Sequence, residues 1–334
     1  MKKLLLTTAM ASSLIATAAF AEVKVGGGME ATLAGTQTGT STAATSGNAI
    51  GFEYELDINA TGELSNGMKI STHAEFISDG HSSGYSNAPN DIGMTIGLND
   101  TTSIIIGQDQ WEVMDQNVVP KAYNIIQDAA NATTYDSLGS SAFAANSNNI
   151  GIAHKAMGGT IGFIYSPATA NNATNSSDRA TTSGGGSAYE LGYNGSLGVE
   201  GLSVVLGVSS KKADTDTGTG ETDGVVYGAA YQMGAIKVGF TVDDVDAPGN
   251  TSSDTKGTTF GITYAVSDAV TVGLQRLTTD IGGASSDEET DMIEVAYNLG
   301  AATLAANMQT TKNQGGSSSN VDLDSYTITL KHSF

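Results

Sequence analysis

The C-terminal stretch, residues 321–334 (VDLDSYTITLKHSF), decides the fold class. Read at every second residue, it separates into two faces: Tyr326, Ile328, Leu330, His332 and Phe334 on one, and Ser325, Thr327, Thr329, Lys331 and Ser333 on the other. This alternation is typical of a β-strand with one apolar and one polar face. A soluble sandwich could produce it, but would give no reason to end on an exposed aromatic ring. A strand of a membrane barrel gives such a reason, because its outer face meets lipid and aromatic side chains gather at the membrane interface.

The same alternation returns along the whole chain. Over residues 50–58, apolar side chains alternate with Glu53, Glu55 and Asp57. Three carboxylates on one face of a strand are costly in a dry core and harmless in a water-filled lumen, so we expect these three to line an interior. Similar segments bring the number of predicted strands to about sixteen, which is enough to enclose an aqueous channel.

The connections between these strands alternate in length. Short turns carry Asn, Asp or Gly, and the longer links are rich in Ser, Thr, Asn, Gly and Asp: 35–48, 79–90, 109–148, 167–186, 212–222, 244–256, 280–288 and 312–320. Transmembrane barrels have short periplasmic turns and long outer loops, and hydrocarbon leaves no sheet edge unpaired. The sequence therefore predicts an all-β fold, a closed transmembrane antiparallel barrel with both termini at the periplasmic end.

The first 21 residues differ from the rest. Lys2 and Lys3 precede a short apolar run that ends in an A-x-A site at residues 19–21, the pattern of a cleaved secretory signal peptide. We expect export and a single barrel domain over residues 22–334, placed in the outer membrane and in contact with its lipid. No later run reaches the ~18 apolar residues that a membrane helix needs.

Composition narrows the function classes further. The formal net charge is −21 and there is no Cys, which argues against nucleic acid as a partner and against thiolate metal sites. No nucleophile elbow, P-loop or zinc spacing of histidines occurs, so no enzyme and no bound cofactor are predicted. Divalent cations such as calcium remain possible in two acidic loop clusters: Asp243, Asp244 and Asp246, and Asp287, Glu288 and Glu289.

The link 109–148 is the longest connection. It holds the only Trp, Trp111, and many other apolar residues, together with acids that include Asp109, Glu112 and Asp115, against one base, Lys121. Structureless links of this length are usually functional or disordered. Apolar anchors combined with acids suit a loop that folds inward, with one side on the wall and the other facing the passage. The alternative is an outer flap used in subunit contacts.

Taken together, the signal peptide, the sixteen predicted strands, the long acidic third outer loop and the terminal Phe334 resemble a Gram-negative general porin, most closely those of alphaproteobacteria. The resemblance implies a homotrimer, passive diffusion of small hydrophilic solutes and a constriction formed by the third loop. It also implies that Phe334, with Tyr326, Ile328 and Leu330, is the signal read by the outer-membrane assembly machinery. His332 departs from the usual apolar choice in this motif.

In that family the constriction sets acids on the third loop against bases on the facing wall. By strand parity the inward-facing bases here are Lys24, Lys69, Lys155 and Lys331, and the opposing loop acids are Asp109, Glu112 and Asp115. The arginine cluster of many enterobacterial porins is missing, since Arg179 falls in a loop and Arg276 on the outward parity. Because acids are in excess and rings of Asp and Glu favour cations, we expect cation preference.

Three other functions remain open at this point. One is a substrate-specific channel, although most Tyr residues fall on the outward parity, whereas sugar-specific channels line their path with aromatic residues. The second is a barrel enzyme such as an outer-membrane phospholipase or protease. The third is a secreted β-sandwich or adhesin.

Overall fold

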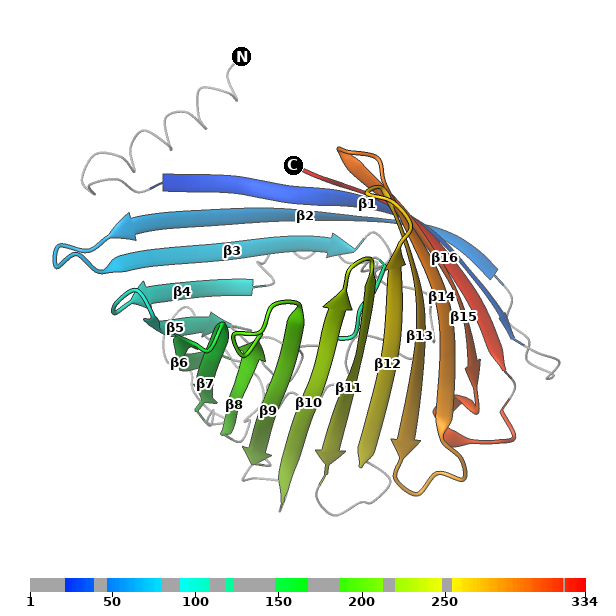
Figure 1. The fold of residues 1–334 in the computed structure, drawn as a ribbon. Coiled ribbons are helices and arrows are strands. Elements are labelled where there is room, and N and C mark those ends of the chain that lie inside the picture. Colours follow the sequence, from blue (N-terminus) through cyan, green and yellow to red (C-terminus); the bar gives the residue numbers. More distant parts are fainter. Residues whose placement is uncertain are drawn as a thin grey trace.

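Sixteen antiparallel strands close into one barrel in the computed structural model (Figure 1). Each strand pairs with its neighbours in chain order, and β16 pairs with β1, so no sheet edge remains. The structure describes residues 22–38, 47–79, 91–108, 118–122, 148–167, 187–212, 220–247, 254–320 and 322–334. Within these ranges the predicted barrel is confirmed.

The strand bounds follow the predicted segments closely. They are β1 (Glu22–Thr38), β2 (Gly47–Glu63), β3 (Lys69–Asp79), β4 (Asp91–Gly97), β5 (Thr102–Gln108), β6 (Asn148–Ala156), β7 (Gly159–Ser166), β8 (Ala188–Gly195), β9 (Leu202–Lys212), β10 (Glu221–Met233), β11 (Ile236–Asp246), β12 (Thr255–Ala265), β13 (Val270–Ile281), β14 (Glu288–Asn298), β15 (Ala302–Lys312) and β16 (Leu323–Ser333), with a short 3-10 helix, η2 (Gln314–Gly316). The first link is shorter than predicted, because Gly35 still pairs with Asn48. Backbone pairing continues there although the apolar pattern has ended.

None of the helices in the part of the chain described here is long and apolar enough to span a membrane.

Both ends of the described chain lie at the end of the barrel that carries the short turns. The backbone N–H of Phe334 donates to the Gly27 carbonyl at 2.9 Å, and that of Gly27 donates to the Phe334 carbonyl at 3.1 Å. The tight β2–β3 turn uses Gly67 at φ 84°, a left-handed conformation that favours glycine. The strand ends that the longer links join lie at the opposite end, as predicted.

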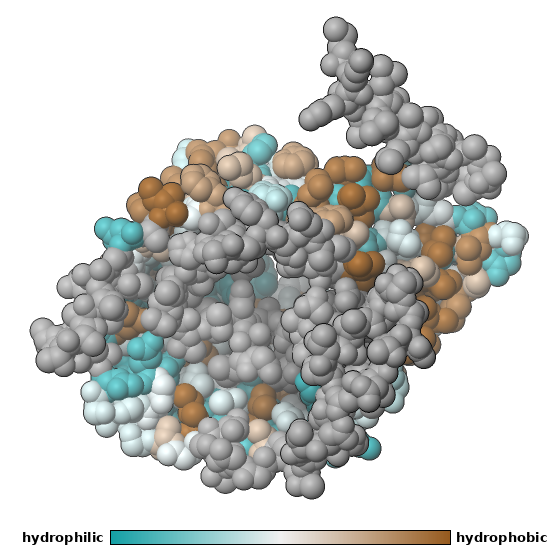
Figure 2. All heavy atoms as spheres, turned by 180° about the vertical axis from the view of Figure 1, so that it is seen from behind, coloured by the Kyte–Doolittle hydropathy of each residue, from teal (hydrophilic) through white to brown (hydrophobic). Residues whose placement is uncertain are grey.

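The two faces of the sheet carry different chemistry. In β2, Phe52 and Tyr54 expose about half of their surface on the outside, whereas Glu53, Glu55 and Asp57 are half-buried on the inner face. The view from behind shows hydrophobic side chains gathered in patches on the exterior (Figure 2). An apolar exterior around a polar interior is the arrangement expected when lipid surrounds a wet lumen.

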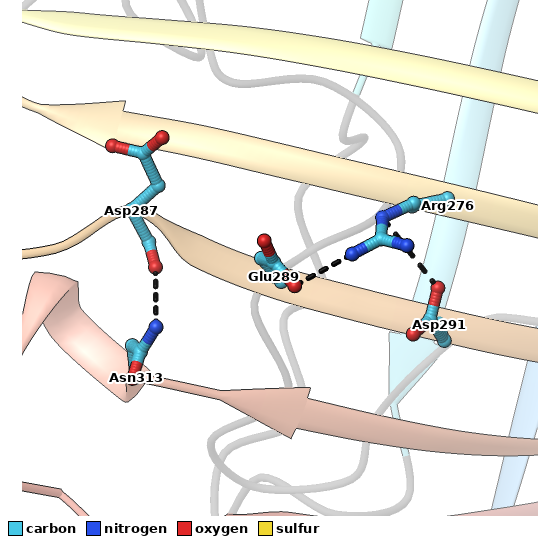
Figure 3. Close-up of polar contacts among 5 residues, drawn as sticks. All are labelled: Arg276, Asp287, Glu289, Asp291 and Asn313. Carbon is cyan, nitrogen blue, oxygen red and sulfur yellow. Dashed lines mark hydrogen bonds and ion pairs between the residues drawn. The ribbon is translucent and has the colours of Figure 1, made fainter. Parts of the chain in front are cut away.

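An ionic group of three residues lies on the apolar exterior, towards the long-loop end. On the outer face, Arg276 of β13 donates from Nη2 to Glu289 Oε2 at 2.6 Å and lies 3.8 Å (Nε) from Asp291 Oδ1, both on β14 (Figure 3). Arg276 is six residues above Val270, the short-turn end of β13. On a strand tilted by roughly 40° this is about 16 Å, which falls within an apolar band about 25 Å tall.

Candidate functional site

The described part of the third loop lies inside the barrel. Residues 118–122, from the connection between β5 and β6, contact inward positions on strands from β9 to β15. Since β5 and β6 lie on the other side of the closed sheet from β12–β14, residues 118–122 lie across the lumen from the two strands that they connect. The inward fold predicted from its apolar residues is therefore confirmed for this segment.

The segment first contacts the wall through valines. Val118 packs against Val205 of β9 and Val226 of β10, both almost fully buried. Val119 is 4% exposed. An ideal Cβ placed on Gly261 of β12 would overlap Val119 Cγ1 and lie 3.0 Å from the Pro120 carbonyl oxygen. Gly261 therefore leaves the space that the loop fills, and a larger side chain there would displace it.

The segment ends in a polar anchor. The backbone N–H of Ala122 donates to Glu294 Oε1 of β14 at 2.5 Å, and Gln275 Nε2 of β13 donates to the same oxygen at 2.8 Å. Glu294 is 4% exposed. An ideal Cβ on Gly273 would lie 2.7 Å from Glu294 Cγ, so this glycine makes room for the glutamate. A buried carboxylate needs such partners, because an unpaired one is strongly disfavoured.

Lys121 is the loop's only base and lies beside this anchor. Burial lowers the pKa of Lys121, while the nearby Glu294 carboxylate opposes this shift by favouring the charged amine. The side chain of the next residue, Ala122, packs against Ala296 and Ala305 of β14 and β15. The base is thus held at the wall with its neighbours.

Acidic side chains line the opposite part of the barrel. We use "acidic wall" for Glu53, Glu55 and Asp57 of β2 with Glu75 of β3. Carboxylate oxygens of the last three lie within 4.8 Å of one another, and Asp57 pairs directly with Glu75 in the strand register. All four are half-buried. In contrast, inward threonines of β14–β16 such as Thr290, Thr311 and Thr329 are almost fully buried. The acidic wall is thus among the more accessible parts of the inner surface.

The four predicted bases share the inward face but not one level. Lys331 lies opposite Glu30, which itself lies opposite Glu53, so this lysine belongs to the same row as the acidic wall. Lys24 lies six residues further along β1, roughly 20 Å away at about 3.3 Å per residue. It pairs with Glu22 at 3.4 Å, and the lysine side chain is 72% exposed.

Lys69 and Lys155 also lie near the short turns. Lys69 begins β3, six residues below Glu75, and the N–H of Lys155 donates to Thr101 of a short turn at 2.7 Å. Lys24 and Lys69 therefore lie closer to the short turns than Lys331 does. Alternation along a strand predicts whether a residue faces inward or outward, whereas the pairing register between strands decides its position along the barrel axis. The loop acids Asp109, Glu112 and Asp115 lie outside the described residues.

The two acid clusters considered for divalent cations are divided by strand alternation. Asp243 is buried on the inner face of β11, whereas Asp244 is exposed on the outer face and lies 3.6 Å from Lys256. Glu288 faces inward and Glu289 outward on β14 in the same way. Acids on opposite faces of a strand do not converge on one ion.

The last strand turns its predicted apolar set outward. Ile328, Leu330 and Phe334 are exposed on the exterior, and the Tyr326 hydroxyl donates to Asn48 Oδ1 at 3.0 Å. Phe334 also faces the His332 ring, with centroids 6.4 Å apart. The outward orientation of the terminal motif is confirmed.

Comparison of the sequence with family models decides the family. The model of the Gram-negative porins matches residues 6–316. The chain belongs to the Gram-negative porin family. It is therefore a channel rather than an enzyme, and the porin fold places it in the outer membrane. No curated protein matches the chain by sequence.

Solved porin structures share the fold. A triple mutant of the Rhodopseudomonas blastica porin matches with a TM-score of 0.65 at 16% identity, covering 94% of this porin and 100% of that chain. The anion-selective porin from Comamonas acidovorans matches with a TM-score of 0.68 at 17% identity, with the same coverage. At such identities the likeness concerns the fold alone, so the lining of this porin has to be judged from its own residues.

Sequence reasoning missed the residues that receive the loop. Glu294, Gln275, Gly261 and Gly273 come from three strands, and only the barrel register brings them together. One signal was present, because Glu294 occupies an inward parity position between two apolar inward residues, Met292 and Ala296. Such a buried carboxylate indicates a polar partner inside the barrel.

Proposed function

We propose that this porin is a diffusion channel for small hydrophilic solutes and ions, that it prefers cations, and that its third loop forms the constriction. The observation that carries the proposal is the position of residues 118–122 against the β9–β15 wall, with the acidic wall on the other side of the barrel. Solutes then pass between a loop rich in acids and a wall rich in acids.

The charge of the inner face supports cation preference. Among the described strand residues, inward acids outnumber inward bases away from the short turns: Glu30, Glu53, Glu55, Asp57, Glu75, Glu190, Asp243, Glu288 and Glu294, against Lys211 and Lys331. Carboxylates that line a passage raise the local concentration of cations. The Comamonas porin is described as anion-selective, and the shared fold does not oppose the proposal, because side chains rather than strands set the sign of the charge.

A general pore fits better than a channel specific for sugars. None of the tyrosines within the described ranges takes an inward strand position, and most are exposed on the exterior, as Tyr227, Tyr264 and Tyr297 are. The passage therefore lacks an aromatic path along the described strands.

Assembly into a homotrimer is part of the proposal. β4 and β5 are only seven residues long, and the neighbouring exterior exposes Ile92, Met94, Ile106, Ile150 and Ile152. A low, apolar wall suits contact with a second copy. We further propose that residues 1–21 are removed on export and that the outward Tyr326, Ile328, Leu330 and Phe334 are recognised by the assembly machinery.

Liposome swelling tests the diffusion function. Purified protein in vesicles should admit neutral sugars at rates that fall steeply with solute size, because the third loop narrows the passage. Vesicles without protein provide the control. Equal exclusion of every sugar by both preparations would contradict an open diffusion channel.

A further inference from the structure

We propose that a groove on the outside of the barrel binds a lipid whose head group carries a primary ammonium. The groove has a volume of about 1070 Å³ and runs across the outer face of the sheet from β12 to β1 and β2. Its outward side chains form one polar row and one apolar row. A lipid has the same two parts, so the groove matches an amphiphile rather than a purely apolar chain.

The polar row consists of Arg276, Asp291, Thr310 and Asp324, which pair in this order across β13–β16. The row rises along the barrel axis because it crosses tilted strands. Arg276 lies about 16 Å above the short-turn end of β13, whereas Asp324 is nine residues above Ser333, the short-turn end of β16. On the same tilt this is about 23 Å, close to the top of an apolar band about 25 Å tall. Asp324 therefore lies at the level where lipid head groups begin.

The apolar row lies directly below the polar row. Leu274, Ile293 and Met308 pair in this order across β13–β15, and each of them exposes more than half of its surface. Phe260 of β12 also lines the groove and is similarly exposed. These side chains offer a surface to an acyl chain that descends from the level of Asp324.

A tyrosine forms the end of the groove at β16. The Tyr326 hydroxyl donates to Asn48 Oδ1 of β2 at 3.0 Å. An ideal Cβ on Gly35 of β1 would overlap the Tyr326 ring, so this glycine leaves the room that the ring needs. Tyr326 follows Asp324 on the same outer face of β16. An aromatic ring beside a carboxylate suits a cationic head group, because both attract positive charge.

The charges of the groove favour the same sign of ligand. Arg276 is held by Glu289 at 2.6 Å and lies 3.8 Å from Asp291 (Figure 3). Asp324 accepts from the Thr310 hydroxyl at 2.7 Å, and the ion pairs of the described residues do not include it. A carboxylate at the edge of hydrocarbon is costly without a cation. A lipid ammonium supplies that cation and donates hydrogen bonds to the carboxylate.

Native mass spectrometry of the delipidated protein tests the proposal. The protein in detergent micelles is titrated with phosphatidylethanolamine, phosphatidylcholine or phosphatidylglycerol of the same chain length, and the bound lipid is counted. Phosphatidylethanolamine should be retained most strongly, because it alone carries a primary ammonium. Asp324→Asn keeps an oxygen for Thr310 but loses the charge, so it should weaken retention of this lipid about tenfold. Asp244→Asn is the control, since this outward acid is held by Lys256 at 3.6 Å outside the groove.

A second pair of variants tests the apolar part of the groove. Ile293→Trp fills the groove and should lower the retention of all three lipids. Val295→Trp, at the next outward position of the same strand but outside the groove, should leave retention unchanged. All four variants should conduct as the wild type does, which shows that the barrel has folded, because each changed residue faces outward.

Three results would overturn the proposal. The first is equal retention of the three lipids by the wild type, or unchanged retention of phosphatidylethanolamine by Asp324→Asn. The second is preferred retention of phosphatidylglycerol that a chelator abolishes, since the acids would then hold a divalent cation. The third is a wild type that retains no lipid together with an Asp324→Asn variant that loses its oligomers, since a second copy of the chain would then cover the groove.

Discussion

Phe334 and Gly27 join the two ends of the sheet through a reciprocal pair of backbone hydrogen bonds of 2.9 and 3.1 Å. The Phe334 ring lies against Gly27, and an ideal Cβ on this glycine would lie 3.2 Å from the ring Cζ and overlap the Glu55 carbonyl oxygen. The closing seam therefore depends on a residue without a side chain. The last residue of the chain contributes to closure through its backbone as well as through its ring.

Gly27→Val should weaken the seam. The new side chain overlaps backbone atoms that cannot move away, and overpacking of this kind costs about 1–3 kcal/mol. The expected result is a lower urea midpoint for unfolding of the barrel in lipid vesicles. On gels of unheated samples, the band of folded protein, which shifts on heating, should be weaker. Gly26→Ala is the control, because its Cβ would meet Phe334 O at an ordinary 3.4 Å. Equal stability of both variants and the wild type would contradict the role of Gly27.

The exterior group of Arg276, Glu289 and Asp291 should be coupled more strongly than an ordinary surface pair. Exposed ion pairs contribute about 0.2–1 kcal/mol, whereas a lone charge against hydrocarbon costs about 2–4 kcal/mol near the bilayer midplane. A double-mutant cycle with Arg276→Leu and Glu289→Gln in vesicles should therefore give a coupling energy above about 1 kcal/mol. A coupling energy near zero would mean that water rather than hydrocarbon surrounds this group.

Neutralising the acidic wall should reduce cation preference. Glu55→Gln, Asp57→Asn and Glu75→Gln together remove three carboxylates that lie within 4.8 Å of one another. The reversal potential in a salt gradient should move towards zero, because fewer cations are concentrated in the passage. Asp223→Asn with Asp246→Asn, two exposed outward acids that pair in the β10–β11 register, should leave it unchanged. A larger change of reversal potential in the Asp223 and Asp246 variant than in the acidic-wall variant would mean that solutes avoid the β2–β3 wall.

The loop acids make a separate contribution. Asp109→Asn with Glu112→Gln should weaken cation preference, since both acids belong to the loop whose segment 118–122 reaches the far wall. The measurement is again the reversal potential, with conductance recorded alongside. No change would show that this part of the loop does not line the narrowest point.

Much of the barrel was predictable because alternation is a local property. Phe52 and Tyr54 fall outside and Glu53, Glu55 and Asp57 inside, as their order in the chain predicts. Lipid outside and water inside enforce this choice on every strand, so a single sequence carries it repeatedly. The same parity correctly assigned Arg276 to the exterior.

Two properties were not predictable from the chain alone: the position of a residue along the barrel axis, and the contacts between residues that are far apart in the sequence. Lys24 and Lys331 share a face and neighbouring strands, yet register separates them by roughly 20 Å. The apolar residues of the third loop predicted that it folds inward, but its landing place depends on Gly261, Gly273 and Glu294, which lie more than a hundred residues further along the chain. Such contacts appear only once the sheet has closed.

The reversal potential of the wild-type protein in a planar bilayer, under a gradient of potassium chloride, tests the central claim most directly. A lumen lined by carboxylates on both the loop and the acidic wall should give discrete conductance steps and a potential with the sign of cation preference. Discrete steps with the sign of anion preference, or no conductance at high protein concentration, would contradict the account.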